Sequence, residues 1–117
     1  MEMADKRREP RVDVSWPLRV AGINGRGDGR VVNISLCGLL FAVDADLEKG
    51  DLVVLRVGLD HDTTIDCVAQ ILRVDTQDDN RAYGADFRYL TAADRQKLSF
   101  ALLLVQEPAL ADRLGSR

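Results

Sequence analysis

The chain has 117 residues, 46% of them hydrophobic and 30% charged, so it can bury one core and little more. Its net charge of −3 argues against a general nucleic-acid binder, whose footprint is usually an excess of positive charge. The longest apolar stretch, residues 100–105, is far too short to span a bilayer, so we expect no membrane insertion.

The first ten residues are polar, show no periodicity and end at Pro10. They contain no apolar region that could serve as a secretory signal, so we expect a flexible arm on a cytoplasmic protein. The two cysteines, Cys37 and Cys67, lack metal-ligand spacing and are most simply free thiols in that compartment.

The segment after this arm alternates between apolar and polar residues and predicts a half-buried strand. Its apolar positions are Val12, Val14, Trp16, Leu18 and Val20. Because Pro17 cannot donate to a strand ladder, this strand is expected at a sheet edge or beside a β-bulge. The glycine-rich stretch 22–29 predicts a hairpin turn, favoured by Asn24-Gly25.

Five further strands follow by the same criteria. They are predicted at 30–35, 39–43, 52–59 and 64–75, with the sixth strand of the chain around Tyr83–Phe87. In the strand at 64–75 the apolar positions change parity at Ile71-Leu72, which predicts a β-bulge.

After Leu90 the apolar period becomes helical. Thr91 and Asp94 predict an N-cap, and Pro108 predicts the end of the helix. The order of elements predicts a mainly β fold, a six-stranded antiparallel β-barrel with a C-terminal helix. We therefore divide the chain into an arm (1–10), a barrel with its helix (11–107) and a short C-terminal tail (108–117).

Two short runs in the first forty residues belong together. The first is Arg7-Arg8-Glu9-Pro10-Arg11 and the second is Asn33-Ile34-Ser35-Leu36-Cys37-Gly38. In order and about two dozen residues apart, they resemble the R-x-x-x-R and [D/N]-x-S-x-x-G motifs of PilZ domains, bacterial receptors for cyclic di-GMP. The run Tyr83-Gly84-Ala85-Asp86-Phe87 resembles the late G-x-x-F strand of that family, so the resemblance covers roughly residues 6–106.

The resemblance implies that Arg7 and Arg11 are the motif arginines and that Arg8 is an additional one. An arginine fork can donate two parallel hydrogen bonds to phosphate or to a guanine edge, and its face stacks on a purine. Lys6 falls where many relatives carry another arginine, which leaves the number of bound ligand molecules open.

The second motif supplies short polar groups. Strand alternation predicts that Asn33 and Ser35 share a face, where they can bind a guanine edge or ribose-phosphate oxygens. Gly38 would allow close backbone approach, or positive φ, at the turn. Aspartate is commoner than asparagine at the first position of this motif in the family. Asn33 keeps the shape but loses a charge.

We interpret the chain as a non-enzymatic cyclic di-GMP receptor that needs no cofactor. No nucleophile–base pairing and no metal-ligand set is visible in the sequence. Ligand would fold the arginine arm over the nucleotide and change the contact with a downstream protein, which the sequence does not identify. Two alternatives stay open: a PilZ-like adaptor that binds no nucleotide, and a barrel that binds single-stranded nucleic acid. The second usually needs aromatic platforms along a basic groove, and this chain has only six aromatic residues.

The C-terminal helix is apolar nearly all around between Leu98 and Val105. If Leu98, Ala101, Leu102 and Val105 face the barrel, Phe100, Leu103 and Leu104 point elsewhere. Such a patch suggests a homodimer or a helix-mediated adaptor contact. The alternative is that residues 109–117 fold back over it.

Overall fold

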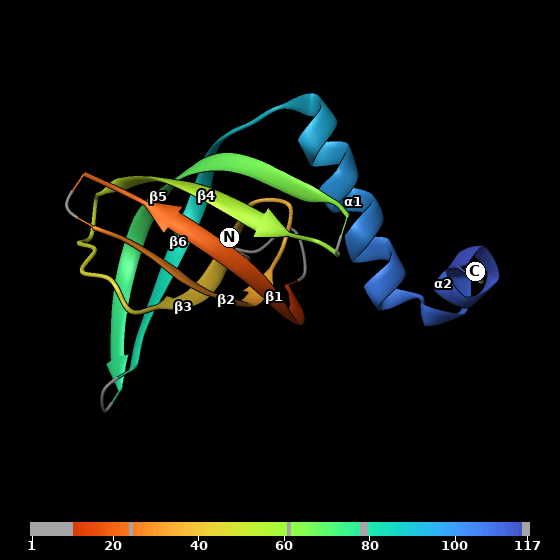
Figure 1. The fold of residues 1–117 in the computed structure, drawn as a ribbon, viewed down its shortest axis with the longest axis horizontal. Helices are drawn as coiled ribbons and strands as arrows, with labels where there is room; N and C mark the ends of the chain where they lie inside the picture. Colours follow the sequence, from red (N-terminus) through yellow and green to blue (C-terminus); the bar gives the residue numbers. More distant parts are fainter. Residues whose placement is uncertain (1–10, 24, 61, 78–79, 116–117) are drawn as a thin grey trace, which may run out of the picture.

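The computed structural model describes residues 11–23, 25–60, 62–77 and 80–115. Six strands form one closed antiparallel barrel in the order β1-β2-β3-β6-β5-β4, which confirms the predicted fold class (Figure 1). The strands are β1 (Val12–Ala21), β2 (Arg26–Ile34), β3 (Gly38–Val43), β4 (Leu52–Gly58), β5 (Thr64–Gln77) and β6 (Asn80–Leu90).

The barrel interior is filled by every second residue of its strands, as expected where one face points inward. In β4, Val53, Leu55 and Val57 are buried, whereas Leu52 and Val54 are exposed. Two large rings meet in this core. The centroids of Phe41 on β3 and Tyr83 on β6 are 5.7 Å apart.

The predicted alternation of β1 is confirmed, and so is an irregularity beside Pro17. The register of β1 against β2 shifts between Asp13 and Trp16. Pro17 lies just before the segment Leu18–Ala21, which closes the barrel against β4. Of the two expectations for Pro17, the bulge is right and the sheet edge is wrong, because barrel closure gives β1 a neighbour on each side.

The second half of the glycine-rich stretch, residues 26–29, belongs to β2, so the predicted turn at 22–29 is too long. The turn itself is closed by a 2.7 Å bond from the Gly22 N–H to the Gly25 carbonyl, and β2 begins directly afterwards. At Gly29 an added Cβ would lie 2.0 Å from the carbonyl oxygen of Ala42 on β3. This glycine is therefore needed for the close approach of two strands rather than for a turn.

Strands β5 and β6 are longer than predicted. The bulge predicted at Ile71-Leu72 is confirmed by a register shift between Ile71 and Arg73, and a second shift lies between Val68 and Ala69. In Figure 1 the two strands run on together past the rest of the barrel, toward the lower left of the view.

Helix α1 (Ala92–Gln106) begins as predicted, with the Thr91 hydroxyl accepting from the Asp94 N–H at 3.0 Å. Leu98 and Leu102 are its buried residues, whereas Val105, expected on the barrel face, is exposed. A second helix, α2 (Pro108–Gly115), replaces the expected tail.

Helix α2 lies at the far end of α1, away from the barrel (Figure 1). Phe100 and Leu103 remain 52% and 43% exposed, so the alternative in which the C-terminal residues fold back over the patch is wrong for these two side chains. Within the described part of the chain, no helix has both the length and the apolar character needed to cross a membrane.

Candidate functional site

The two sequence motifs meet where β1 and β2 pair. Register pairs Val12 with Ile34 and Asp13 with Asn33, so Arg11, just before β1, lies beside the end of β2. Its Nη1 donates to Oδ1 of Asn33 at 3.0 Å in a partly buried position. The last arginine of the first motif is thus joined to the first residue of the second. Lys6, Arg7 and Arg8 lie outside the described residues.

Ser35 has a different position from the one expected. β2 ends at Ile34, so strand alternation does not place Ser35 on the face of Asn33. The side chain is buried, and its Oγ accepts from the N–H groups of Cys37 at 3.1 Å and Gly38 at 3.4 Å. This is a serine turn, in which the hydroxyl replaces a backbone acceptor. Its visible role is to shape the turn between β2 and β3.

Gly38 is needed for packing against β6. It is paired with Asp86, and an added Cβ would lie 2.3 Å from the carbonyl oxygen of Ala85. Among the described glycines, Gly50 is the one with positive φ, at +95°. The close approach expected at Gly38 is therefore made to a neighbouring strand, and positive φ is not the reason for this glycine.

The same turn also contacts the late G-x-x-F strand and helix α1. The Phe87 N–H donates to the Cys37 carbonyl at 2.9 Å, and Nη1 of Arg95 donates to the Leu36 carbonyl at 3.3 Å. Sequence reasoning missed Arg95, because its contact spans 59 positions and depends on where α1 lies against the barrel. The turn is thus held from two sides, while Cys37 is exposed and Asn33 half-buried.

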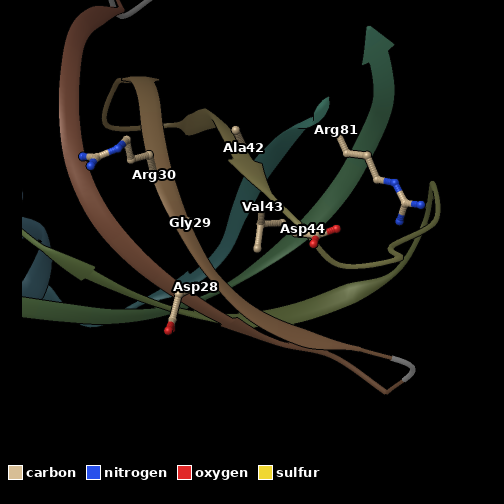
Figure 2. A pocket seen from close by; sticks show the side chains of 7 residues that line it. All are labelled: Asp28, Gly29, Arg30, Ala42, Val43, Asp44 and Arg81. Atoms are coloured by element: carbon tan, nitrogen blue, oxygen red, sulfur yellow. The ribbon is translucent and has the colours of Figure 1, made fainter. Parts of the chain in front are cut away.

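A separate hollow of about 430 Å³ lies on the barrel wall, between β2, β3 and β6 (Figure 2). Figure 2 shows Arg30 and Arg81 on opposite sides of it, with their guanidinium groups pointing away from each other. Arg30 donates to the Ser15 hydroxyl at 3.1 Å, and Arg81 forms an ion pair with Asp46. Because Asp28 and Asp44 also line this hollow, the charges of its lining balance, and the motif residues that the structure describes, Arg11, Asn33, Ser35 and Gly38, do not line it.

The buried cysteine of β5 is not a reactive thiol at neutral pH. Burial, reinforced by Asp66 and Asp94, raises the pKa of the Cys67 thiol to about 12, so this cysteine stays protonated at neutral pH. No cluster of metal-ligating side chains occurs among the residues that the structure describes.

Solved structures with the same fold come from several bacteria. The inhibitor of motility MotI of Bacillus subtilis superposes with a TM-score of 0.73 at 17% identity, over 87% of this chain and 52% of that one. The PilZ domain of YcgR from Escherichia coli, solved with c-di-GMP, gives 0.73 at 14% identity, over 94% of this chain and 98% of that one. The MrkH–c-di-GMP complex of K. pneumonia superposes with a TM-score of 0.75 at 18% identity, over 93% of this chain and 56% of that one.

The chain spans about half the length of MotI and of MrkH. At these identities the likeness shows the fold. No curated protein matches the chain in sequence. The PilZ domain family itself matches residues 5–103, which include both motifs, the whole barrel and most of α1. The chain therefore belongs to the PilZ domain family.

Proposed function

We propose that this chain is a bacterial cyclic di-GMP receptor that acts through a change of protein contact rather than through catalysis. The observation that carries the proposal is the bond from Arg11 to Asn33, because it brings the two family motifs to one end of the barrel. Family membership and two neighbours solved with c-di-GMP support the same ligand for this chain. A cytoplasmic location is part of the proposal.

The arginines supply the charge that this ligand requires. Cyclic di-GMP carries two phosphodiester charges and two guanine edges, and a guanidinium fork suits both. Arg11 would stay anchored beside Asn33 while Arg7, Arg8 and Lys6 close over the nucleotide. Ordering such an arm costs conformational entropy, which charge-assisted hydrogen bonds to the phosphates can offset.

The second motif would act mainly through its turn. Ser35 fixes the N–H groups of Cys37 and Gly38, and the missing side chain of Gly38 lets the turn lie against β6. Asn33 is the motif residue left to present polar atoms at the surface. Its amide group can donate to the ligand while its oxygen accepts from Arg11.

Helix α1 is the proposed output surface. Arg95 ties its first turns to the Leu36 carbonyl of the motif turn, so a shift of that turn on binding would act directly on the helix. Further along, α1 borders a groove of about 470 Å³ whose apolar lining includes Trp16, Leu59 and Phe100. Because Phe100 and Val105, which line this groove, are exposed, this face of α1 suits an apolar contact with a downstream protein.

Calorimetric titration with cyclic di-GMP, GMP and a single-stranded oligonucleotide, side by side, tests this function. The receptor proposal requires saturable binding of cyclic di-GMP that is much tighter than that of GMP. Binding of the oligonucleotide alone would favour the nucleic-acid alternative. Absence of binding in all three titrations would favour the nucleotide-independent adaptor, which the exposed face of α1 also suits.

A further inference from the structure

The hairpin of β5 and β6 carries a strand edge that barrel closure does not cover. β4 pairs with β5 only from Thr64 to Gln70, and the loop before β4 adds bonds between Ile71 and residues 50 and 51. After the bulge at Leu72, β5 continues to pair with β6 from Arg73 to Gln77. Among the described residues, none pairs with 72–77 on the side away from β6. Figure 1 shows this part of the hairpin extending beyond the barrel.

This edge bears both apolar and charged side chains. Leu72 and Val74 are 45% and 42% exposed. Arg73 and Asp75 flank Val74 and form an ion pair at 3.5 Å, with both side chains more than half exposed. Proteins usually protect a free edge with charge, proline or a cover, since its backbone groups can pair with another strand. Here a bulge and one ion pair protect the edge, with Leu72 in the bulge and Val74 between the two charged residues of the ion pair.

We propose that a second copy of this chain pairs antiparallel with the first along 72–76 of β5, about a two-fold axis at Val74. In that register Arg73 of each copy lies directly opposite Asp75 of the other, which gives two cross-strand ion pairs. Val74 meets its own counterpart, and Leu72 meets Thr76. The sequence of this edge is therefore complementary to itself.

The neighbouring registers of the two strands are destabilised by repulsion between like charges. An axis at Arg73 would place two arginines directly opposite each other, and an axis at Asp75 would place two carboxylates together. Like charges directly opposite on paired strands are destabilising. Only the axis at Val74 brings opposite charges together on both sides. Charge thus selects a second copy, in one register, as the occupant of this edge.

The proposed contact lies apart from the motif site and goes beyond the receptor function. Arg11 and Asn33 belong to the pairing of β1 with β2, whereas residues 72–76 extend past the pairing of β4 with β5. A dimer of this kind would leave the face of α1 open, and either proposal can fail without the other.

Charge exchange tests the register. The association of the full chain is followed by sedimentation equilibrium at low salt, for the wild type, Arg73→Asp, Asp75→Arg and the double exchange. Each single variant places like charges opposite each other twice. We therefore expect the dissociation constant of the dimer to rise by on the order of tenfold or more. The double exchange restores both ion pairs and should dimerise like the wild type.

Mixing the two single variants gives the sharpest readout. The Arg73→Asp chain presents two carboxylates and the Asp75→Arg chain two guanidinium groups, so a one-to-one mixture should form mixed dimers more readily than either chain alone. Arg19→Asp, which disrupts the exposed ion pair with Asp28 on another part of the wall, is the matched control and should leave association unchanged. Calorimetry with cyclic di-GMP should give wild-type affinity for every variant.

Three results would overturn the proposal. They are a wild type that stays monomeric up to millimolar concentration, single variants that dimerise like the wild type, and a double exchange or mixture that fails to recover association. Far-ultraviolet circular dichroism and thermal melts verify folding. If one single variant does not fold, Arg73→Gln and Asp75→Asn take its place, each with a smaller loss of association expected.

Discussion

Arg11 and Asn33 are joined by a side-chain hydrogen bond of 3.0 Å although 22 positions separate them. The bond follows from the pairing of β1 with β2, which places Asp13 opposite Asn33. Folding of the barrel itself therefore brings the two motifs together. One of the arginines that the proposed ligand needs is already positioned before any ligand arrives, which lowers the entropic cost of binding.

Arg11→Ala should weaken cyclic di-GMP binding about tenfold or more, since a hydrogen bond to a charged group contributes roughly 1.5–3 kcal/mol. Arg11→Lys should also bind poorly, because a point charge cannot replace the planar fork. Isothermal titration calorimetry measures both. Arg19→Ala removes an exposed arginine of β1, the strand that follows Arg11, and is the control. Near-native affinity in both Arg11 variants would contradict the site assignment.

Asn33→Asp should keep the fold and retain binding. A carboxylate in this place would accept from the same Nη1 of Arg11 and add opposite charge to an existing hydrogen bond. The expected result is an affinity within a few-fold of the wild type, measured by the same titration. Complete loss of binding would mean that the amide N–H of Asn33, which aspartate lacks, carries the ligand contact.

Gly38 and Gly50 separate two reasons for keeping a glycine. Gly38→Ala should lower the free energy of unfolding by about 2 kcal/mol or more, because the new Cβ would overlap the carbonyl of Ala85. Gly50→Ala has open space but a φ of +95°, and should cost about 1 kcal/mol through backbone strain. Urea unfolding gives both values. Equal stability of Gly38→Ala and the wild type would show that the strands can separate to admit a methyl group.

The stability of the fold should fall in alkali through Cys67. Burial raises the pKa of this thiol from 9.0 to about 12, so the folded state holds its proton more tightly than the unfolded state. The stabilisation is complete below about pH 9 and is lost as the pH rises toward 12. The expected slope from this group is at most about 1.4 kcal/mol per pH unit.

Cys67→Val removes the titrating group and keeps an apolar side chain. Urea unfolding at pH 8, 9 and 10 under reducing conditions should show a shallower alkaline decline in the variant than in the wild type. A constant offset from altered packing does not affect this comparison, which depends on slope alone. Parallel curves would show that the Cys67 thiol does not couple to folding.

The two faces of α1 should respond differently to charge. Phe100→Glu with Leu103→Glu alters exposed positions and should change the free energy of unfolding by less than about 1 kcal/mol. Leu102→Glu, at a buried position of the same helix, should cost more than 3 kcal/mol. Thermal unfolding distinguishes them. The exposed variant should also retain nucleotide binding and the dimer proposed at β5. If this exposed variant were monomeric where the wild type dimerises, the dimer contact would lie on α1 and not on β5.

Much of the barrel follows from alternation in the sequence. A period of two residues predicts the inward face of β1, and a change of parity predicts the bulge at Ile71. Composition failed at residues 26–29, because glycine serves both turns and close strand approach. Pro108 follows the end of the first helix as predicted, but composition did not reveal that it also occupies the first position of a second helix, α2.

The candidate site was less predictable than the barrel. The motifs identify Arg11 and Asn33, and strand pairing then joins them. The inward position of Ser35 depends on β2 ending one residue earlier, and the bond from Arg95 depends on the placement of α1. A periodic pattern in the sequence predicts neither the position of Ser35 nor the bond from Arg95, since both arise from the packing of distant segments.

The barrel closes through a short seam. β1 and β4 share four residue pairs, Leu18 with Val57 through Ala21 with Val54, whereas β5 and β6 share ten. Amide hydrogens along the seam should therefore exchange with solvent sooner than those between β5 and β6, because local opening begins where the fewest bonds must break. Arg11 directly precedes the strand that forms this seam. A ligand held by Arg11 would restrain that strand and slow the exchange.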